Sequence, residues 1–231
     1  MDECIDSLGE AKVLTTLDCN SGFWQIPIRE SDRDKTSFVC HHSSFRWKRM
    51  PMGLTNSPAT FQRALDMILA QFKWQTCLIY IDDIIIFSKD EESHLDHVDQ
   101  VLEALHRANV TIKLKKCDFF TNKVKYLGHI IEPGKLSVDK VRVKALEETV
   151  PPENKTQLRA FIGLCNVYRR FVKNFAEIAK PLNDLLKKGM PDVFPRLKPE
   201  QTEAFRKRRQ ALLEPPVLAL PVAGRRYSCL L

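Results

Sequence analysis

The alternation of apolar and polar positions predicts short strands around one unusual stretch, Leu78 to Ser88, which reads LIYIDDIIIFS. Its apolar residues favour buried strands, yet two adjacent carboxylates, Asp82 and Asp83, interrupt the run. Because Asp is also a turn residue, the pattern predicts a strand, a tight turn and a strand, with both acids at the tip of an apolar hairpin. A further strand, Val13 to Asp18, is predicted to deliver a third acid to its end.

Other strands and helices follow from the spacing of apolar residues. Alternation predicts two short strands within residues 29–49, joined by a turn at His41 to Ser44, and strands at 111–116 and 124–131. A 3.6-residue spacing predicts helices at about 58–73, 93–108, 154–172, 175–188 and 199–213. Residues 135–150 and 190–199 read as connectors, and the stretch from Glu214 has no assigned packing role. This order predicts an α+β fold, a sheet with helices on one side.

Capping residues and apolar stripes support three of these helices. Ser57 before Pro58, Ser93 with Asp96, and Asn154 with Gln157 are typical helix starts. The stripes that we expect to pack against neighbouring elements are Phe61, Leu65, Ile68 and Phe72; Leu95, Val98, Leu102 and Leu105; and Leu158, Phe161, Ile162, Cys165, Tyr168 and Val172.

Composition permits a packed core and limits the class of protein. The chain has 231 residues, of which 44% are hydrophobic, enough for one or two domains. It has no apolar run near the roughly 20 residues of a membrane span, and its start lacks a signal-peptide layout, so we expect an intracellular, cytoplasmic protein without membrane contact. Seven widely spaced cysteines without a CxxC pair predict reduced thiols, those of Cys4, Cys19, Cys40, Cys77, Cys117, Cys165 and Cys229.

The net charge of +7 is unevenly distributed. Residues 1–150 hold 20 Lys and Arg against 22 Asp and Glu, whereas residues 151–231 hold 16 against 7. A basic region joined to one that bears clustered carboxylates suits a nucleic-acid enzyme, because phosphates need Lys and Arg while a catalytic cation needs Asp. A solvated helical face is the alternative explanation for part of the positive charge.

The Asp pair is the candidate chemical centre. Buried carboxylates cost several kcal/mol each unless they are paired, protonated or bound to a cation, and magnesium prefers such hard oxygen ligands. A merely solvated Asp-Asp turn is the alternative. Zinc chemistry has little support, since His41, His42, His94 and His97 have no cysteine partners at zinc-site spacing and are expected in surface or loop roles.

Several blocks resemble, in the right order, the reverse transcriptases of gypsy-class long-terminal-repeat retrotransposons. The blocks, which lie between about Leu14 and Pro221, are LTTLDCNSGFWQIPI, RMPMGLTNSPATFQRAL, YIDD, KLKKCDFF, KYLGHII and LRAFIGLCNVYRRFVKNFAEIAKPLNDLL. The resemblance implies a polymerase palm, an antiparallel sheet backed by helices, followed by a helical thumb, with incomplete fingers. It implies palm at 1–28 and 53–134, partial fingers at 29–52, thumb at 135–189, and a linker at 190–231 toward an RNase H domain.

The resemblance also implies roles for individual residues. Asp18, Asp82 and Asp83 would hold two Mg²⁺ ions, for which Mn²⁺ is a possible substitute. Lys116, or its neighbour Lys115, would protonate the pyrophosphate leaving group. The implied nucleotide-binding residues are Phe23, which would block a ribose 2′-hydroxyl, together with Met52, Gly53 and Gln62. The implied primer and template contacts are Tyr80, Ile81, Leu127, Gly128, His129, Arg159, Gly163 and Asn166.

The resemblance therefore predicts an RNA-directed DNA polymerase fragment, whose partners are an RNA or DNA template-primer and deoxynucleoside triphosphates, in a virus-like particle if the element is active. The family's upstream fingers strands are not in this sequence, and no acid follows Glu214, so we expect no RNase H activity from the chain. A catalytically silent remnant that only binds nucleic acid is the alternative.

Overall fold

The computed structural model of the chain describes residues 5–194 and 196–221. The chain divides into two compact units, each described by itself below. The first comprises Met1–Tyr126, Glu132–Gly134 and Leu220–Leu231, and the second comprises Leu127–Ile131 and Lys135–Ala219. Cys4, Cys229 and the tail from residue 222 lie outside the described residues, so the predictions for them are not tested.

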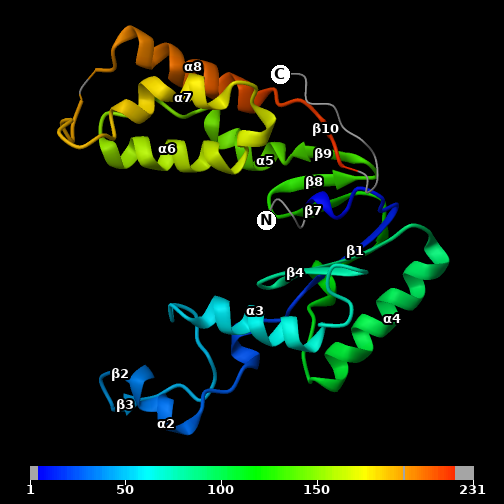
Figure 1. Cartoon of the computed structure of the whole chain (residues 1–231). Helices are drawn as coiled ribbons and strands as arrows, with labels where there is room; N and C mark the ends of the chain where they lie inside the picture. The colour runs from blue at the N-terminus through cyan, green and yellow to red at the C-terminus, as the bar shows by residue number, and fades with distance from the viewer. Residues whose placement is uncertain (1–4, 195, 222–231) are drawn as a thin grey trace. The chain divides into compact units, whose positions relative to one another are not determined.

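An antiparallel sheet forms the centre of the first unit, with the strand order β4-β5-β1-β6 (Figure 1). Its strands are β1 (Val13–Asp18), β4 (Cys77–Tyr80), β5 (Asp83–Ser88) and β6 (Asp118–Thr121). The predicted strand at Val13 and the predicted apolar hairpin are both confirmed, the hairpin as β4 and β5. β4 and β5 form because their β-branched and aromatic residues are buried as the side chains alternate between the two faces of the sheet. β6 is mostly exposed and is held by its pairing with β1.

Two helices, α3 (Ser57–Ile68) and α4 (Glu91–Arg107), pack on one face of this sheet. Their inward side chains meet alternate residues of the strands in one hydrophobic core, formed by Leu17, Cys19, Met50, Phe61, Leu65, Leu69, Phe72, Cys77, Ile79, Ile84, Ile86, Val98, Val101 and Leu105. The prediction of helices on one side of a sheet is thus confirmed. α3 ends five residues earlier than predicted, at Ile68, because the chain after it turns back toward β4, where the backbone N–H of Cys77 donates to the carbonyl of Phe72.

The predicted caps of α3 and α4 are wrong in detail. Asn56 is the N-cap residue of α3, and Ser57 Oγ instead donates to the carbonyl of Pro51 at 3.2 Å. α4 starts two residues before the predicted Ser93, because the Asp90 carboxylate accepts the backbone N–H of Ser93 at 2.9 Å. Leu95 of α4 is 62% exposed, so it does not belong to the buried stripe.

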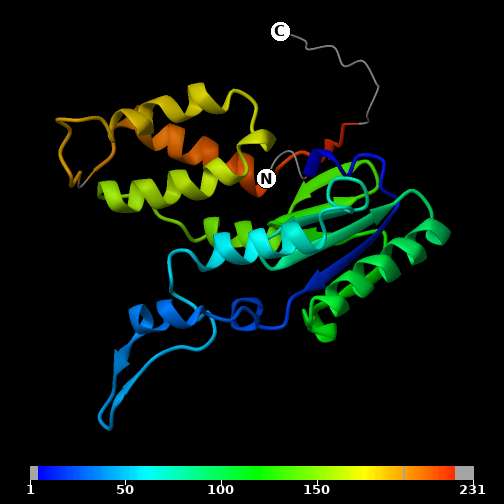
Figure 2. The ribbon, with the colours of Figure 1, turned by 60° about the horizontal axis from the view of Figure 1, so that its bottom comes forward.

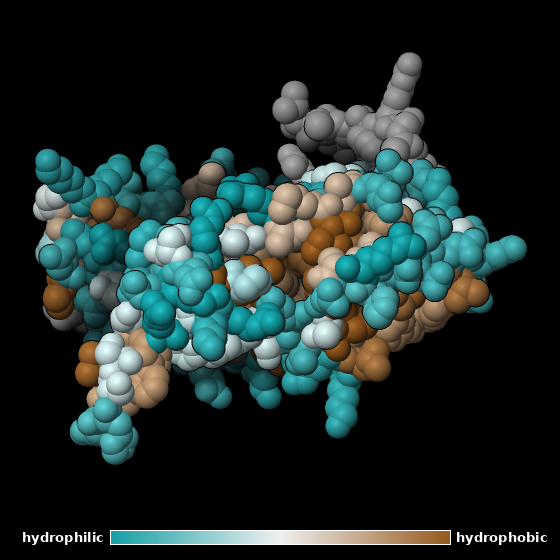
Figure 3. All heavy atoms as spheres, turned by 90° about the horizontal axis from the view of Figure 1, so that it is seen from below, coloured by the Kyte–Doolittle hydropathy of each residue, from teal (hydrophilic) through white to brown (hydrophobic). Residues whose placement is uncertain are grey.

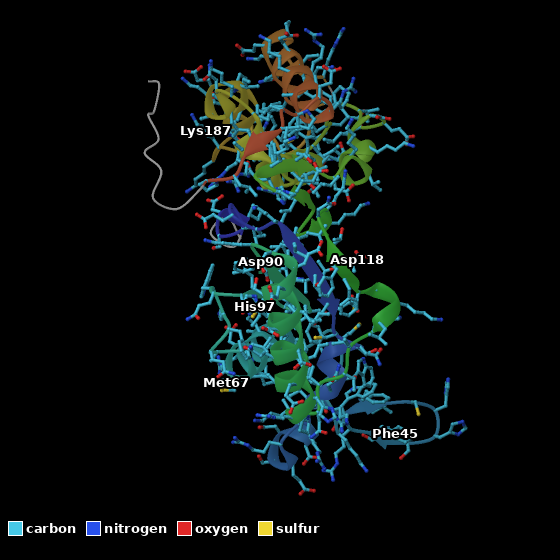
Figure 4. All side chains as sticks on the ribbon, turned by 90° about the vertical axis from the view of Figure 1, so that its right-hand side faces the viewer. Phe45, Met67, Asp90, His97, Asp118 and Lys187 are labelled. Atoms are coloured by element: carbon cyan, nitrogen blue, oxygen red, sulfur yellow. The ribbon has the colours of Figure 1, made fainter. Side chains whose placement is uncertain are left out.

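His94 takes the buried place on α4, against the prediction of a surface or loop role. Its side chain is fully buried, and its ring nitrogens contact Thr15 Oγ1 at 2.7 Å and Ser88 Oγ at 2.8 Å. Ser88 Oγ also contacts Nδ1 of His97, which lies one turn further along α4 (Figure 4). This network of hydrogen bonds joins α4 to β1 and β5. Burial lowers the pKa of His94 to about 4.

Residues 22–45 form small elements, of which the later ones, from residue 30 on, lie away from the sheet (Figure 2). They are η1 (Gly22–Gln25), α2 (Glu30–Arg33), η2 (Asp34–Thr36), β2 (Phe38–Val39) and β3 (Ser44–Phe45). The predicted pair of short strands is confirmed, since Phe38 pairs with Phe45. The helical turns before them were not predicted. They form where three acids alternate with three cations, as in the Lys35–Asp32 ion pair.

Two predicted strands are interrupted. Residues 111–116 contain only an isolated bridge, Cys19 with Ile112, followed by the turn η3 (Leu114–Lys116), because this segment bends around the end of β1. Residues 124–131 form two strands, β7 (Val124–Tyr126) and β8 (His129–Glu132). Leu127 and Gly128 lie between them with φ values of 51° and 82°, a left-handed conformation that no continuous strand adopts.

The second unit combines strands with a group of helices. Within it β9 (Lys135–Val138) lies between β8 and β10 (Leu218–Ala219). The helices and turns are α5 (Lys140–Val143), η4 (Lys144–Leu146), α6 (Lys155–Val167), η5 (Arg169–Phe171), α7 (Phe175–Asp184) and α8 (Pro199–Leu213). Residues 135–150 are therefore structured rather than a plain connector, and β10 gives part of the unassigned C-terminal stretch a packed role.

In this unit the predictions that depend on residues close together in the sequence are mostly confirmed. The Asn154 side chain caps α6 by accepting the backbone N–H of Gln157 at 2.9 Å, and α8 has the predicted bounds. All six residues of the predicted α6 stripe are buried, although Tyr168 and Val172 lie beyond the end of that helix. α7 ends at Asp184 rather than at about Lys188, and α8 packs against it.

The face of the molecule seen in Figure 3 is mostly hydrophilic, with separate hydrophobic patches. Exposed apolar side chains among the described residues include Met67 of α3, which is 69% exposed. No helix in residues 5–194 or 196–221 has both the length and the apolar character required to cross a bilayer.

Candidate active site

The register of the sheet brings the three predicted acids to one place. β1 and β5 are antiparallel, and Asp18 is paired directly with Asp83. Side chains that are directly opposite in such a pair lie on the same face of the sheet. Asp82 is held beside them, because its carbonyl accepts the backbone N–H of Cys19 at 3.3 Å. The prediction that Asp18 meets the Asp pair is supported by this geometry.

The turn of the hairpin differs slightly from the prediction. Ile81 and Asp82 form the two-residue tip, whereas Asp83 already belongs to β5 and pairs with Tyr80. Ile81 has a φ of 55°, which is rare for a β-branched residue. The two acids therefore leave the backbone from different positions, one in the turn and one in the strand.

Asp82 is the electrostatically unusual member of the three. Its Oδ1 atom is buried and has no hydrogen-bond partner in the part of the chain that the structure describes. Burial raises the pKa of this carboxyl, and the nearby charges of Asp83 and Asp18 raise it further, whereas Lys116 lowers it. A carboxylate in such surroundings is stabilised by a cation.

Lys116 supplies one positive charge at the site. The backbone N–H of Lys113 donates to the carbonyl of Asp18 at 2.8 Å, which fixes the start of the turn η3 beside the end of β1. From that turn Lys116 Nζ reaches Asp18 Oδ2 at 3.1 Å. Between the two lysines left open by the sequence, Lys116 is the one that contacts the acids.

These side chains line a small cavity of about 180 Å³. Five residues predicted for the site lie in its wall, namely Asp18, Phe23, Met52, Asp82 and Lys116. Five others were not predicted from the sequence, namely Cys19, Asn20, Ser21, Gly22 and Lys113. The first four break the strand pattern after Asp18, and that break could have indicated a loop at the site. Lys113 gave no such indication, because its segment alternates like a strand.

Gly22 shapes the cavity through its lack of a side chain. A Cβ at this position would lie 2.7 Å from two ring carbons of Phe61 and 2.9 Å from Asp82 Oδ1. The Phe23 ring packs edge to face against Phe61, with 5.8 Å between the ring centroids. Cys19 lies in the wall too, but burial raises its pKa to about 12, so its thiol stays protonated and is no candidate nucleophile.

Two residues predicted to bind nucleotide do not line this cavity. Gly53 lies in the turn before α3 with a φ of 92°, next to Met52, whose side chain is 70% exposed. Gln62 lies behind the hairpin, where its Oε1 accepts the backbone N–H of Ile81 at 2.6 Å. Gln62 therefore contacts the tip that carries the acids rather than the cavity.

The predicted primer-holding residues belong to the second unit. Leu127 and Gly128 form the left-handed turn before β8, and the carbonyl of Gly128 accepts hydrogen bonds from the backbone of Asp139 and from Tyr168 Oη, each at 3.3 Å. His129 is buried and stacks on Phe171. These contacts make a fixed turn.

Arg159, Gly163 and Asn166 share one exposed face of α6. Their spacing of four and then three residues places them in a row along the helix. No atom lies within 4 Å of a Cβ built on Gly163, so this face is open at its middle.

The acids of the first unit suit a divalent cation, although they do not form a closed cage. In the described residues no three His, Cys, Asp or Glu side chains come together in metal-holding geometry. The buried, unpartnered Oδ1 of Asp82 and the register of Asp18 with Asp83 nevertheless bring hard oxygen donors close together. Magnesium typically binds through one or two carboxylates with substrate phosphates and water, so the residues fit it.

Comparison with protein families and curated proteins agrees with the geometry. Residues 2–131 match the family model described as "Reverse transcriptase (RNA-dependent DNA polymerase)". The chain is 39% identical over 227 residues to the retrovirus-related Pol polyprotein from transposon 297 of Drosophila melanogaster, covering 98% of this chain and 21% of that protein. It is 43% identical over 181 residues to the corresponding polyprotein from transposon gypsy of the same organism, covering 78% and 18%. The chain spans about a fifth of the length of these relatives.

Solved structures share the fold. A foamy viral protease-reverse transcriptase in complex with double-stranded DNA superposes with a TM-score of 0.80 and 27% identity, covering 89% of this chain and 36% of that one. A second, in complex with an RNA/DNA hybrid, gives a TM-score of 0.78 and 27% identity over 91% and 29%. The predicted α+β polymerase fold and the predicted resemblance are confirmed. This chain belongs to the reverse transcriptase family and is related to the enzymes of gypsy-class retrotransposons.

Proposed function

We propose that the chain is a polymerase fragment that extends a primer 3′-hydroxyl with deoxynucleotides on an RNA or DNA template. The observation that carries this proposal is the register of β1 with β5, which sets Asp18 opposite Asp83 and next to Asp82. Membership of the reverse transcriptase family supports the reaction class. The nucleic acids bound in related solved structures support a duplex as the partner.

Asp18, Asp82 and Asp83 would hold divalent cations, Mg²⁺ or Mn²⁺. Such cations would supply electrostatic stabilisation, by lowering the pKa of the attacking hydroxyl and neutralising charge on the phosphates. Asp82 would be a principal ligand, because its buried oxygen has no other partner among the described residues. Catalysis then consists of positioning and electrostatics, as in other phosphoryl transfers.

The remaining residues of the cavity bind and orient the nucleotide. Lys116, whose Nζ lies 3.1 Å from Asp18 Oδ2, is the proposed proton donor to the departing pyrophosphate. Phe23 packs against Phe61 as a rigid wall and excludes a ribose 2′-hydroxyl, and Met52 lines the same cavity. Gly53, next to Met52 but outside the cavity wall, leaves room for the nucleotide to approach the backbone. Tyr80 and Ile81 flank the primer end.

The second unit binds the duplex product. The turn of Leu127, Gly128 and His129 holds the primer strand, and Arg159, Gly163 and Asn166 follow the minor groove with contacts to phosphates and sugars, which carry no base specificity. The protein acts inside the cell, in a virus-like particle if its element is active.

Primer extension tests the proposal directly. The chain is mixed with poly(rA)/oligo(dT), dTTP and either Mg²⁺ or Mn²⁺, and product length is followed with time. We expect extension by the wild-type chain and a loss of at least a hundredfold in Asp82→Asn. Asp118→Asn is the matched control, because Asp118 is an exposed carboxylate on β6, outside the cavity wall. Salt-sensitive duplex binding without extension would instead identify a silent remnant that only binds nucleic acid.

A further inference from the structure

Gln62 makes contacts that a nucleotide-binding residue would not need. Its Oε1 accepts the backbone N–H of Ile81 at 2.6 Å, and its Nε2 donates to Asp66 Oδ1 at 2.9 Å and to the carbonyl of Ile79 at 3.4 Å. Both amide protons are therefore used within the protein. Gln62 therefore binds the backbone at two points, the carbonyl of Ile79 just before the hairpin tip and the N–H of Ile81 within it.

The orientation of the Gln62 amide is fixed by its partners. A backbone N–H can only donate and an ionised carboxylate can only accept, so Oε1 must face Ile81 and Nε2 must face Asp66. Asp66 is fixed in turn by Lys73, whose Nζ lies 2.7 Å from Asp66 Oδ1. Asp66 and Lys73 are 32% and 26% exposed, so this ion pair is partly shielded from solvent.

The chain of contacts follows the whole length of β4. Lys73 forms a bridge with Cys77 at the start of the strand, and Gln62 holds Ile81 just after its end. Gln62 and Asp66 lie four residues apart on α3, so they share one face of that helix. The strand that leads into the tip is thus held at both ends by contacts from Lys73, Asp66 and Gln62.

The tip needs such a brace because of its conformation. Ile81 adopts a φ of 55°, which disfavours a β-branched residue and persists only where the surroundings enforce it. Asp82 and Asp83 follow Ile81 directly, so a change at Ile81 would move both carboxylates. The Gln62 hydrogen bond is the side-chain contact that holds the Ile81 backbone.

We propose that Gln62, oriented by Asp66 and Lys73, is a positioning residue that sets the hairpin tip for catalysis and does not touch the nucleotide. This inference rests on the proposed polymerase function for its kinetic consequence, although the hold on Ile81 does not depend on that function. The contacts predict two effects that can be measured separately, on the mobility of the tip and on the reaction rate.

Three variants separate positioning from packing. Gln62→Met keeps the volume and removes the hydrogen bonds of the amide. Gln62→Glu keeps the acceptor for Ile81 but sets a second carboxylate against Asp66. The double variant Gln62→Glu with Asp66→Asn restores the hydrogen bond between the two side chains with donor and acceptor exchanged. It gives up the Lys73 contact, because Gln62 and Lys73 share Oδ1 of Asp66. Gln71→Met is the matched control, since Gln71 is exposed just beyond α3 and its side chain has no hydrogen bond to the tip among the described residues.

For Gln62→Met we expect at least tenfold faster hydrogen exchange of the Ile81 amide and a ten- to hundredfold lower kcat in primer extension, with KM for dTTP within twofold of wild type. Gln62→Glu should behave similarly, and the double variant should regain kcat to within about threefold of wild type. A role in packing alone would give no such rescue.

The outcomes distinguish this inference from the proposed function. Wild-type Ile81 exchange and wild-type kcat in Gln62→Met would overturn the inference, as would a raised KM for dTTP at unchanged kcat, which would identify a nucleotide contact. If the wild-type chain does not extend a primer, the proposed function fails. In that case the inference is tested by the broadening that Mn²⁺ causes in the NMR signals of the Asp82 and Asp83 backbone amides. Weaker broadening in Gln62→Met than in wild type supports the inference, and equal broadening overturns it.

Discussion

Replacing Gly22 with alanine is the smallest change that should disable the cavity. The added methyl group would lie 2.7 Å from two Phe61 ring carbons, at least 0.7 Å inside the 3.4 Å limit of ordinary contact, and 2.9 Å from Asp82 Oδ1. Phe61 is fully buried in the core, so its ring has no space to retreat. We therefore expect the loop that bears Gly22, or the Asp82 side chain, to move instead.

The size of the effect follows from that displacement. Overpacking of this kind costs about 1–3 kcal/mol of unfolding free energy, and a misplacement of about 1 Å at a reacting centre costs about a hundredfold in rate. We expect Gly22→Ala to remain folded by circular dichroism at low temperature, with a urea midpoint below that of wild type. Its single-turnover rate of primer extension should fall by about thirty- to a hundredfold.

A folded Gly22→Ala variant with at least half of the wild-type rate would refute this reasoning. It would mean that Asp82 tolerates a displaced wall and that the cavity does not fix the reacting groups. Rate and stability must be measured on the same preparation, because a loss of folded protein alone would lower the apparent rate without any misplacement.

Three other predictions concern stability and nucleic-acid binding. The pKa of His94 is lowered from 6.5 to about 4, so the stabilisation from neutral His94 is fully present above pH 6.5 and is lost as the pH falls toward 4. At pH 5 the loss of unfolding free energy is about 2 kcal/mol. Urea denaturation of His94→Gln should lack that part of the pH dependence. Arg208 is buried over the Phe175 ring, and its guanidinium nitrogens have no hydrogen-bond partner among the described residues. Arg208→Met should leave the urea midpoint unchanged or raise the unfolding free energy by about 1–2 kcal/mol. A marked loss of stability would contradict the assignment of a buried charge without hydrogen bonds. Gly163→Ala should raise the stability of α6 by about 0.5–1 kcal/mol and weaken duplex binding in a fluorescence-anisotropy titration, because the methyl group enters the open face; unchanged affinity would remove α6 from the interface.

Local sequence signals were sufficient for much of the fold. The apolar hairpin interrupted by two acids, the strand that ends on Asp18, and the helix that begins at Pro199 were all found from periodicity and turn chemistry. The α6 stripe and its Asn154 cap depend on residues within two turns of one another, so pattern alone identified them.

Errors arose where distant parts of the chain override the local pattern. His94 takes the buried place expected for Leu95 because hydroxyls from two strands satisfy its ring nitrogens, which no property of α4 alone reveals. Lys113 and Lys116 lie in a segment that alternates like a strand, but it bends because its partner is the end of β1.

The candidate site could be predicted as a set of residue types but not as a geometry. The resemblance implied roles for Asp18 and Asp82, but their meeting depends on the pairing of strands about 65 residues apart, and register is set by the buried face of the whole sheet. The function of Gln62 illustrates the same limit. Its place in the nucleotide block suggested a ligand contact, whereas the structure turns its amide toward the hairpin.

The clustered acids explain why a lysine belongs in this cavity. Burial and two neighbouring acids raise the pKa of Asp82, so the site favours any positive charge that can approach it. Lys116 provides that charge through Asp18, yet its side chain is 56% exposed and is held by this one ion pair among those described, so little energy is needed to release it. In the proposed reaction, bound cations and a triphosphate would give Asp18 a stronger partner and would free the ammonium group to turn toward the phosphates. We therefore expect the same side chain to stabilise the acids before the substrate binds and to donate its proton after it has bound.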